Sequence, residues 1–173
     1  MKNQSITEAM LQFIEESPTA FHAAANVEAL LLENGFEKLE NLAEGALVPG
    51  GSYYTMQNGS AVLAVKIPEN PAKGFRIAAS HSDSPCFKIK EVPEMKVENT
   101  YVKLNVEKYG GMILSPWLDR PLSVAGRVFV AGKDGKPEAK LVNLKKDLLI
   151  IPNVAIHFNR EINNGFAYNP QTD

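Results

Sequence analysis

The sequence of 173 residues has little cysteine, little net charge and no long hydrophobic run. Its single cysteine, Cys86, excludes an intrachain disulfide framework and suits a reducing compartment. The net charge is −2, so no broad positive field favours nucleic acid or an anionic membrane as a partner. No apolar run approaches the roughly 20 residues that span a bilayer, and residues 1–17 lack the apolar core of a secretory signal. We therefore expect a cytoplasmic protein with neither nucleic acid nor membrane among its partners.

The remaining composition is typical of a folded domain. Hydrophobic residues make up 45% and charged residues 22%, which is too apolar for a disordered chain. The length suffices for one good-sized domain or two small ones.

The first third of the chain predicts two helices. The first ends before Pro18, since the residue preceding a proline avoids the helical region. Thr19 can cap a second helix from Ala20 to about Asn34, and Gly35 is suited to end it. The buried stripe expected on this second helix is Ala24, Val27, Leu30 and Leu31.

Strand signals follow from residue 52. Two strands, 52–56 and 61–67, are expected to join across Asn58-Gly59, the strongest short hairpin signal. Residues 75–80 form a continuous apolar run that fits a strand buried on both faces. This half predicts the opening of an α/β unit, because helices precede strands that need covering on both sides.

The second half alternates polar and apolar residues and predicts a mostly antiparallel sheet. Residues 96–111 and 120–144 carry this alternation, the latter around a turn at 133–136, and residues 148–152 predict one more strand. We expect a domain boundary near residues 91–95, dividing the chain into domains 1–92 and 93–173. The polar end of the sequence closes with neither helix nor strand, and little would cover the second face of the first sheet. We therefore expect both domains to be truncated.

The stretch 77–87, IAASHSDSPCF, carries the first candidate site. In an extended chain, His81 and Asp83 project to the same side, and open α/β sheets bind ligands beyond their strand ends. A metal-bound imidazole usually has its second nitrogen held by a carboxylate or carbonyl, so this pair suits one metal ligand and its support. The alternatives are a loop histidine paired with a carboxylate, or a Ser/Asp turn before Pro85.

Two other residues are better explained by packing. Cys86 has no second cysteine with which to bind a metal, and we expect a buried small hydrophobe; the alternative is a nucleophile with His81 as its base. His22 has small apolar neighbours on the second predicted helix, which favours a packing histidine.

Two further positions leave the choice more open. His157 follows the apolar residues 154–156 and is either a polar residue at a strand end or a contact to substrate. Asp119 and Arg120 are adjacent and favour a structural ion pair. No phosphate-binding glycine loop and no serine-hydrolase elbow occurs in the sequence.

Four motifs together are more specific than any one of them. In this order they resemble the aspartyl aminopeptidase family of zinc metallopeptidases along the whole chain. The motifs are SPTAFHAA (17–24), ASHSDSPCFKIK (79–90), VEKYGGM with PWLDRPLSVAGRV (106–112 and 116–128), and IPNVAIHFNREINNGFAYNPQTD (151–173).

The resemblance implies an α/β fold, in which an α/β zinc-peptidase catalytic domain is followed by a β-rich dimerisation domain. The predicted boundary near residues 91–95 coincides with the start of that insert. The family's site holds two zinc ions bridged by an aspartate and a water, with a glutamate as general base. It also implies dimers assembled into larger particles. Family membership favours acidic N-terminal residues in the substrate, although some relatives prefer neutral or hydrophobic ones.

Residue by residue, the resemblance implies that His81 is a zinc ligand and that Asp83 is the catalytic-site aspartate that steadies it. His157 matches a histidine of the dimerisation domain that contacts substrate in a partner subunit's active site. Ser82 stands where threonine is common and keeps the hydroxyl. The other metal ligands and the general base would lie beyond residue 173, so we expect the zinc centre to be incomplete and this chain alone to be inactive.

Three functions remain in competition. The first is part of a metalloaminopeptidase that removes N-terminal residues from peptides through a metal-activated water. The second is a natural short, non-catalytic assembly or interaction module derived from the same family. The third, a cysteine hydrolase using Cys86 and His81, requires thiol-dependent hydrolysis by this chain alone.

Overall fold

The computed structural model of the chain describes residues 5–40, 47–70 and 74–165. Contacts divide the chain into two compact units, one of Met1–Asp83 with Val124–Lys145 and one of Ser84–Ser123 with Lys146–Asp173. This grouping differs from the domains 1–92 and 93–173. The predicted domains mark where a catalytic domain and its insert begin and end along the sequence, and they stay a prediction.

Two helices open the first unit, and both begin at a side-chain cap. Helix α1 (Ile6–Glu16) starts at a capping box, in which the Ser5 side chain accepts from the Glu8 amide. Helix α2 (Ala20–Glu33) starts at Thr19, whose side chain accepts from the His22 amide. Gly35 follows α2 with φ at 77°, a left-handed conformation that favours glycine. The predicted end of the first helix and both predicted ends of the second are confirmed.

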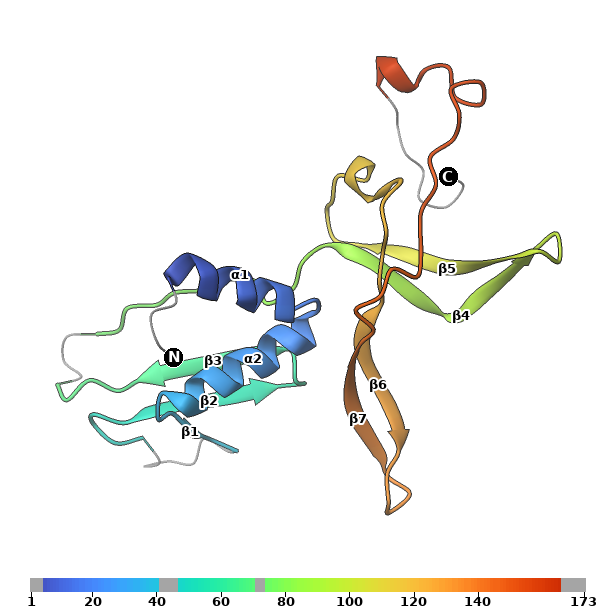
Figure 1. The fold of residues 1–173 in the computed structure, drawn as a ribbon. Helices are drawn as coiled ribbons and strands as arrows, with labels where there is room; N and C mark the ends of the chain where they lie inside the picture. Colours follow the sequence, from blue (N-terminus) through green and yellow to red (C-terminus); the bar gives the residue numbers. More distant parts are fainter. Residues whose placement is uncertain (1–4, 41–46, 71–73, 166–173) are drawn as a thin grey trace. The chain divides into compact units, whose positions relative to one another are not determined.

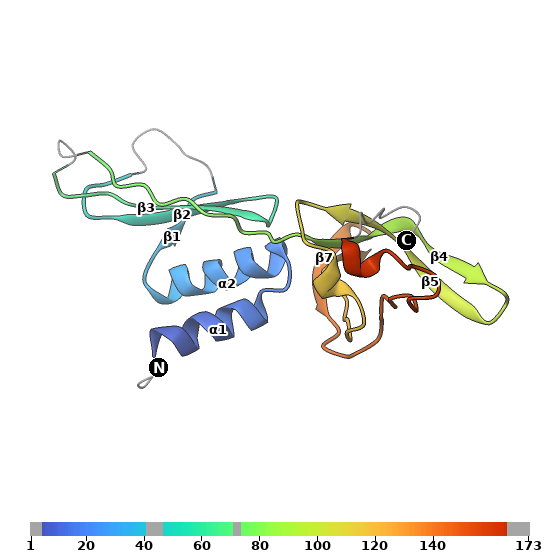
Figure 2. The same ribbon diagram turned by 90° about the horizontal axis from the view of Figure 1, so that it is seen from above.

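The sheet of the first unit has three strands in the order β1-β2-β3. Strand β1 (Glu37–Lys38) is parallel to β2 (Ser52–Gln57), which is antiparallel to β3 (Ala61–Lys66). Asn58 and Gly59 both have positive φ, 54° and 67°, as the two central residues of a type I′ turn require, and the Ser60 amide donates to the Gln57 carbonyl. The predicted hairpin is confirmed. Figure 2 shows both helices on one side of this sheet, with α2 next to it.

Residues of α2 and β2 form the core of this unit. The buried hydrophobic residues among those described are Ala23, Ala24, Tyr53 and Tyr54. The predicted stripe on α2 is therefore only partly right: Ala24 is buried, but Leu30 is 44% exposed. Since only one side of α2 contacts the sheet, the stripe that it buries is narrower than its apolar surface.

The strand expected at residues 75–80 is wrong. These residues have no strand pairing within the described part of the chain, and Phe75 and Ile77 are 59% and 90% exposed. A strand buried on both faces needs neighbouring strands and two covering layers. The described residues supply neither to this segment, so its apolar character alone does not make it a strand.

A second hairpin belongs to the first unit by its contacts. Strands β6 (Ala125–Ala131) and β7 (Pro137–Asn143) pair antiparallel around the predicted turn at 133–136, where the Gly132 amide donates to the Lys136 carbonyl. This confirms the hairpin predicted within residues 120–144.

The second unit contains one long hairpin (Figure 1). Strand β4 (Cys86–Val97) pairs antiparallel with β5 (Tyr101–Tyr109), with an irregularity between Ile89 and Glu94. At its base, the Phe87 and Trp117 rings meet edge to face at 5.3 Å, Trp117 coming from the short helix η2 (Ser115–Trp117). Another short helix, η3 (Ile162–Asn164), lies near the end of the described residues.

One mostly antiparallel sheet, as expected for the second half, is not formed by the described residues. Strands β4–β5 and β6–β7 make two separate hairpins. Residues 148–152 contribute two isolated bridges, Leu149 to Leu122 and Ile151 to Leu118, where a strand was expected. Pro121 and Pro152 adjoin these bridges and lack the amide hydrogen that would extend a ladder.

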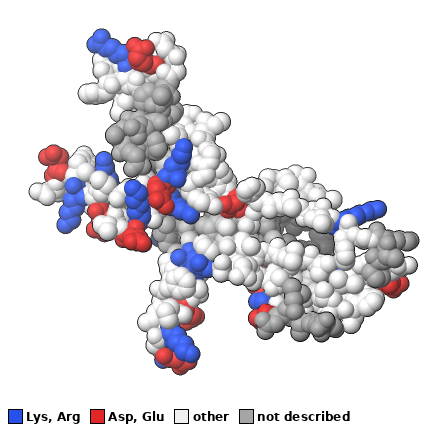
Figure 3. All heavy atoms as spheres, turned by 180° about the vertical axis from the view of Figure 1, so that it is seen from behind, with Lys and Arg blue, Asp and Glu red and all other residues white. Residues whose placement is uncertain are grey.

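No helix in the described ranges combines the length and apolar character that crossing a membrane requires. On the face shown in Figure 3, acidic and basic side chains are interspersed. This mixture agrees with the small net charge of −2.

Candidate metal-binding site

The His81–Asp83 pair forms, but in a loop that bends at Ser82 and not in the extended backbone from which it was expected. His81 Nδ1 lies 2.9 Å from Asp83 Oδ1, and the two side chains are 90% and 30% exposed. An ionised carboxylate can only accept, so in the neutral ring the hydrogen lies on Nδ1 and Nε2 keeps its lone pair. That is how a metal-binding histidine is held when a carboxylate supports its other nitrogen.

A serine between the two residues ties the segment to the sheet. The Ser82 hydroxyl donates to the Ser60 carbonyl oxygen at 2.8 Å, and Ser60 closes the β2–β3 turn by donating its amide to Gln57. The sequence alone indicates only that Ser82 retains a hydroxyl. The hairpin signal places Ser60 in a turn, but nothing local in the sequence joins that turn to residue 82.

The described residues fit one zinc ligand and its support, not a whole zinc centre. Structural zinc sites have four protein ligands and catalytic sites usually have three. Within the described residues, no group of three histidine, cysteine, aspartate or glutamate side chains could hold a metal ion. His81, steadied by Asp83, is the single candidate that the geometry supports here.

His22 is a packing histidine, as expected. Its Nδ1 lies 2.8 Å from Thr19 Oγ1 at the start of α2. Burial lowers the pKa of His22 from its usual 6.5, which favours the neutral ring.

Cys86 is less enclosed than expected. It is the first residue of β4 and is half buried, whereas full burial was predicted. Every residue of β4 is either half buried or exposed, so this strand offers no fully buried position. Its alternative role as a nucleophile stays a prediction.

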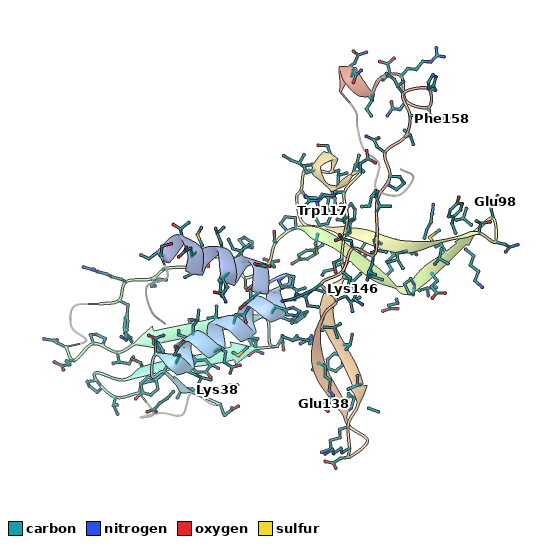
Figure 4. The ribbon with its side chains drawn as sticks, viewed as in Figure 1. Lys38, Glu98, Trp117, Glu138, Lys146 and Phe158 are labelled. Atoms are coloured by element: carbon teal, nitrogen blue, oxygen red, sulfur yellow. The ribbon has the colours of Figure 1, made fainter. Side chains whose placement is uncertain are left out.

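His157 lies in an exposed turn, not at the end of a strand as one reading expected. The turn is closed by the Phe158 amide, which donates to the Ala155 carbonyl at 2.8 Å. Phe158 is 84% exposed and projects from this loop in Figure 4. A contact between His157 and substrate stays a prediction.

The ion pair expected between Asp119 and Arg120 is wrong. Asp119 Oδ1 accepts from the Asn153 amide at 2.8 Å, while Arg120 donates to the Pro116 carbonyl at 3.4 Å. Asp119 also has φ at 53°, a conformation that aspartate tolerates better than most residues. Asp119 therefore fixes the beginning of the loop that carries His157, a role that adjacency in sequence did not reveal.

Comparisons with known proteins agree across the chain. The family model described as "Aminopeptidase I zinc metalloprotease (M18)" matches residues 13–173. The chain is 48% identical to the "Probable M18 family aminopeptidase 2" of Clostridium acetobutylicum, covering 100% of this chain and 41% of that relative. It therefore spans about two fifths of the length of that curated relative.

Solved structures give the same assignment. In the cryo-EM structure of the Ape4 and Nbr1 complex, one chain matches with a TM-score of 0.86 and 36% identity, over 95% of this chain and 32% of that one. A chain of the yeast mApe1 dodecamer matches with a TM-score of 0.79 and 28% identity, over 88% and 36% respectively.

Proposed function

Because the chain belongs to the M18 family of zinc aminopeptidases, we propose that it supplies part of the active site of an enzyme that removes residues from the N-termini of peptides. The observation that carries this proposal is the His81–Asp83 pair, with Nδ1 and Oδ1 2.9 Å apart. His81 would bind zinc through Nε2, and Asp83 would fix the tautomer and the ring orientation.

Bound zinc in such enzymes lowers the pKa of a water and polarises the scissile carbonyl. The contribution of this chain is to hold one imidazole in the tautomer that can bind a metal. Because the ring is exposed, Nε2 is accessible to a zinc ion whose other ligands come from other residues. In this proposal, a complete subunit holds two zinc ions.

The proposal also covers the dimerisation domain, the substrate contact, self-association, specificity and location. We assign residues 93–173 to a dimerisation domain, and His157 to contact with substrate in a partner subunit. Its exposed turn supports that role. Self-association of the complete subunit is supported by the yeast relative, which is a dodecamer. We further propose that the enzyme prefers peptides with an acidic N-terminal residue and that it is cytoplasmic.

A non-catalytic assembly module is the second candidate. It is favoured by one observation, that no group of three possible metal ligands lies together in the described ranges. The reading frame after Asp173 separates the two candidates. Continuation with further aspartate, glutamate and histidine ligands supports the enzyme, and an immediate stop supports the module.

The direct test compares His81→Ala with His22→Ala in the complete subunit. Zinc content and hydrolysis of aspartyl, glutamyl and leucyl peptides are measured for both. We expect His81→Ala to lose most activity and about one zinc per subunit, because a catalytic zinc has about three protein ligands. His22→Ala removes a histidine that packs against Thr19 and should keep its zinc. Wild-type zinc content and turnover in His81→Ala would overturn the assignment.

A further inference from the structure

The hydroxyl of Ser82 links the His81–Asp83 segment to the sheet of the first unit. It donates to the Ser60 carbonyl oxygen at 2.8 Å. His81 itself is 90% exposed, so packing does not hold the ring in place. The geometry of the pair therefore depends on the backbone that carries it.

Ser82 is well placed to control that backbone. The backbone bends at Ser82. His81 and Asp83 lie on either side of this bend and their side chains meet at 2.9 Å, while the Ser82 hydroxyl bonds to Ser60. A bond that fixes the middle residue limits rotation of the chain on both sides, and so limits the relative positions of the imidazole and the carboxylate.

Two sets of contacts fix the β2–β3 turn that accepts this bond. On one side it is closed by six consecutive residue pairs between β2 and β3, from Ser52 with Lys66 to Gln57 with Ala61. On the other side, Arg127 of β6 donates through Nη1 to the Asn58 carbonyl at 2.7 Å. Arg127 is in turn placed over the Phe21 ring of α2, 4.0 Å from its centre.

We propose that Ser82 is a positioning residue, which uses the β2–β3 turn as a fixed point to hold the His81–Asp83 pair in its metal-binding geometry. The purpose of this role rests on the proposed function. The role itself concerns only the orientation of two side chains and can be measured without metal.

The experiment is nuclear magnetic resonance of the 173-residue chain, labelled with 15N in histidine. Long-range proton–nitrogen correlations at about pH 8, where histidine is ordinarily neutral, report which ring nitrogen carries the hydrogen. The variants are Ser82→Ala, Ser82→Thr and Ser80→Ala. Ser80 is the matched control, because its side chain makes no hydrogen bond within the part of the chain described.

We expect the wild-type His81 ring to be mainly the Nδ1–H tautomer. Ser82→Ala should lower the ratio of the two tautomers by about five-fold, the order of effect that one exposed hydrogen bond carries. Ser82→Thr keeps a hydroxyl and should restore the ratio, while Ser80→Ala should leave it unchanged. A general loss of packing would change the tautomer ratios of all three histidines, whereas loss of positioning would change only that of His81.

An unchanged His81 tautomer in Ser82→Ala would overturn this inference. So would an equal change in Ser80→Ala, because the effect would not then depend on the bond to Ser60. Failure of the proposed function is seen separately, as wild-type zinc content in His81→Ala of the complete subunit. Each measurement can therefore fail without the other.

Discussion

The guanidinium carbon of Arg127 lies 4.0 Å from the centre of the Phe21 ring, so a residue of β6 covers an aromatic side chain of α2. The same guanidinium donates to the Asn58 carbonyl at 2.7 Å. One side chain thus connects a hairpin, a helix and a turn that are distant in sequence. A cation over a ring and a charged hydrogen bond both favour arginine at this position.

We expect Arg127→Ala to lower the free energy of unfolding by about 1–2 kcal/mol, because it removes the hydrogen bond to Asn58 and the contacts with the Phe21 and Phe129 rings at a half-buried position. Arg127→Lys should recover only part of this free energy of unfolding, since an ammonium group lacks the planar surface that stacks on a ring. Urea denaturation measures both. Arg120→Ala is the control, because Arg120 makes only a 3.4 Å bond to a neighbouring carbonyl. Equal losses at the two arginines would show that the contacts of Arg127 contribute nothing specific.

Glu28 is expected to make stability depend on pH. Glu28 Oε1 lies 2.9 Å from Lys38 Nζ and accepts from the Tyr54 hydroxyl at 3.0 Å. Figure 4 marks Lys38 on the short strand beside α2. The hydrogen bond from Lys38, and then that from Tyr54, keep the pKa of Glu28 below its usual 4.5 despite partial burial.

The folded state therefore binds a proton on Glu28 more weakly than the unfolded state does. The resulting stability is present above pH 4.5 and is lost as the pH falls through the lower pKa of the folded state. Glu28→Gln should reduce this acid-dependent loss and lower stability at neutral pH by less than about 1 kcal/mol, since the pair is partly exposed. Thermal melts at several pH values check this. Glu33→Gln on the same helix is the control, and the same change of slope there would contradict the assignment.

Asp83 offers a graded test of the candidate site. In the complete subunit, Asp83→Asn should retain more zinc than His81→Ala but react about 10–100-fold more slowly, because it weakens only the support of a ligand. The amide side chain of this variant keeps an oxygen that can accept from Nδ1, which is why zinc should be partly retained. Zinc content and turnover measured together separate the two effects. An Asp83→Asn enzyme that matched wild type in both would remove Asp83 from the site.

The sequence predicted those parts of the fold whose cause is local. Thr19, Gly35 and Asn58-Gly59 carry their structural consequence within a few residues, and each cap or turn formed as expected. Residues 75–80 and 148–152 failed as strands, because a strand depends on partners that its own residues do not specify. Apolar runs predict burial only where other segments supply the second surface.

The same distinction applies to the candidate site. The His81–Asp83 pair was expected from a period of two in extended backbone. The two side chains do meet, but across a bend at Ser82. The bond from Ser82 to Ser60 and that from the Asn153 amide to Asp119 join residues far apart in sequence. No local pattern distinguishes these polar residues from others in loops, so only the folded chain reveals the contacts.

Asp119 is expected to order the loop that carries His157. Asp119→Ala removes the acceptor of the Asn153 amide and places a residue without a polar side chain at φ of 53°. Amide hydrogen exchange should therefore become faster at residues 153–158. Asp119→Asn keeps an oxygen acceptor and tolerates the left-handed conformation, so exchange should return close to the wild-type rate. Unchanged exchange in Asp119→Ala would show that the loop is held by other contacts.

The 173-residue chain by itself is expected to show no peptidase turnover and only weak zinc binding. His81 supplies one ligand, whereas a catalytic zinc usually has three protein ligands, and metal affinity rises with a preformed and fully liganded site. The chain should also self-associate. Several large apolar side chains are strongly exposed in both units, among them Ile77 at 90% and Val92 at 76%. Exposed apolar patches of this kind drive association.

The measurements are peptide hydrolysis with added zinc, calorimetric titration with zinc, and light scattering of the purified chain. His81→Ala is the matched variant, and it should abolish the weak zinc binding while leaving the scattering unchanged. The two properties separate in this way because one depends on an imidazole and the other on apolar surface. Efficient aminopeptidase turnover by a monodisperse monomer would contradict both the count of zinc ligands and the argument from exposed apolar residues.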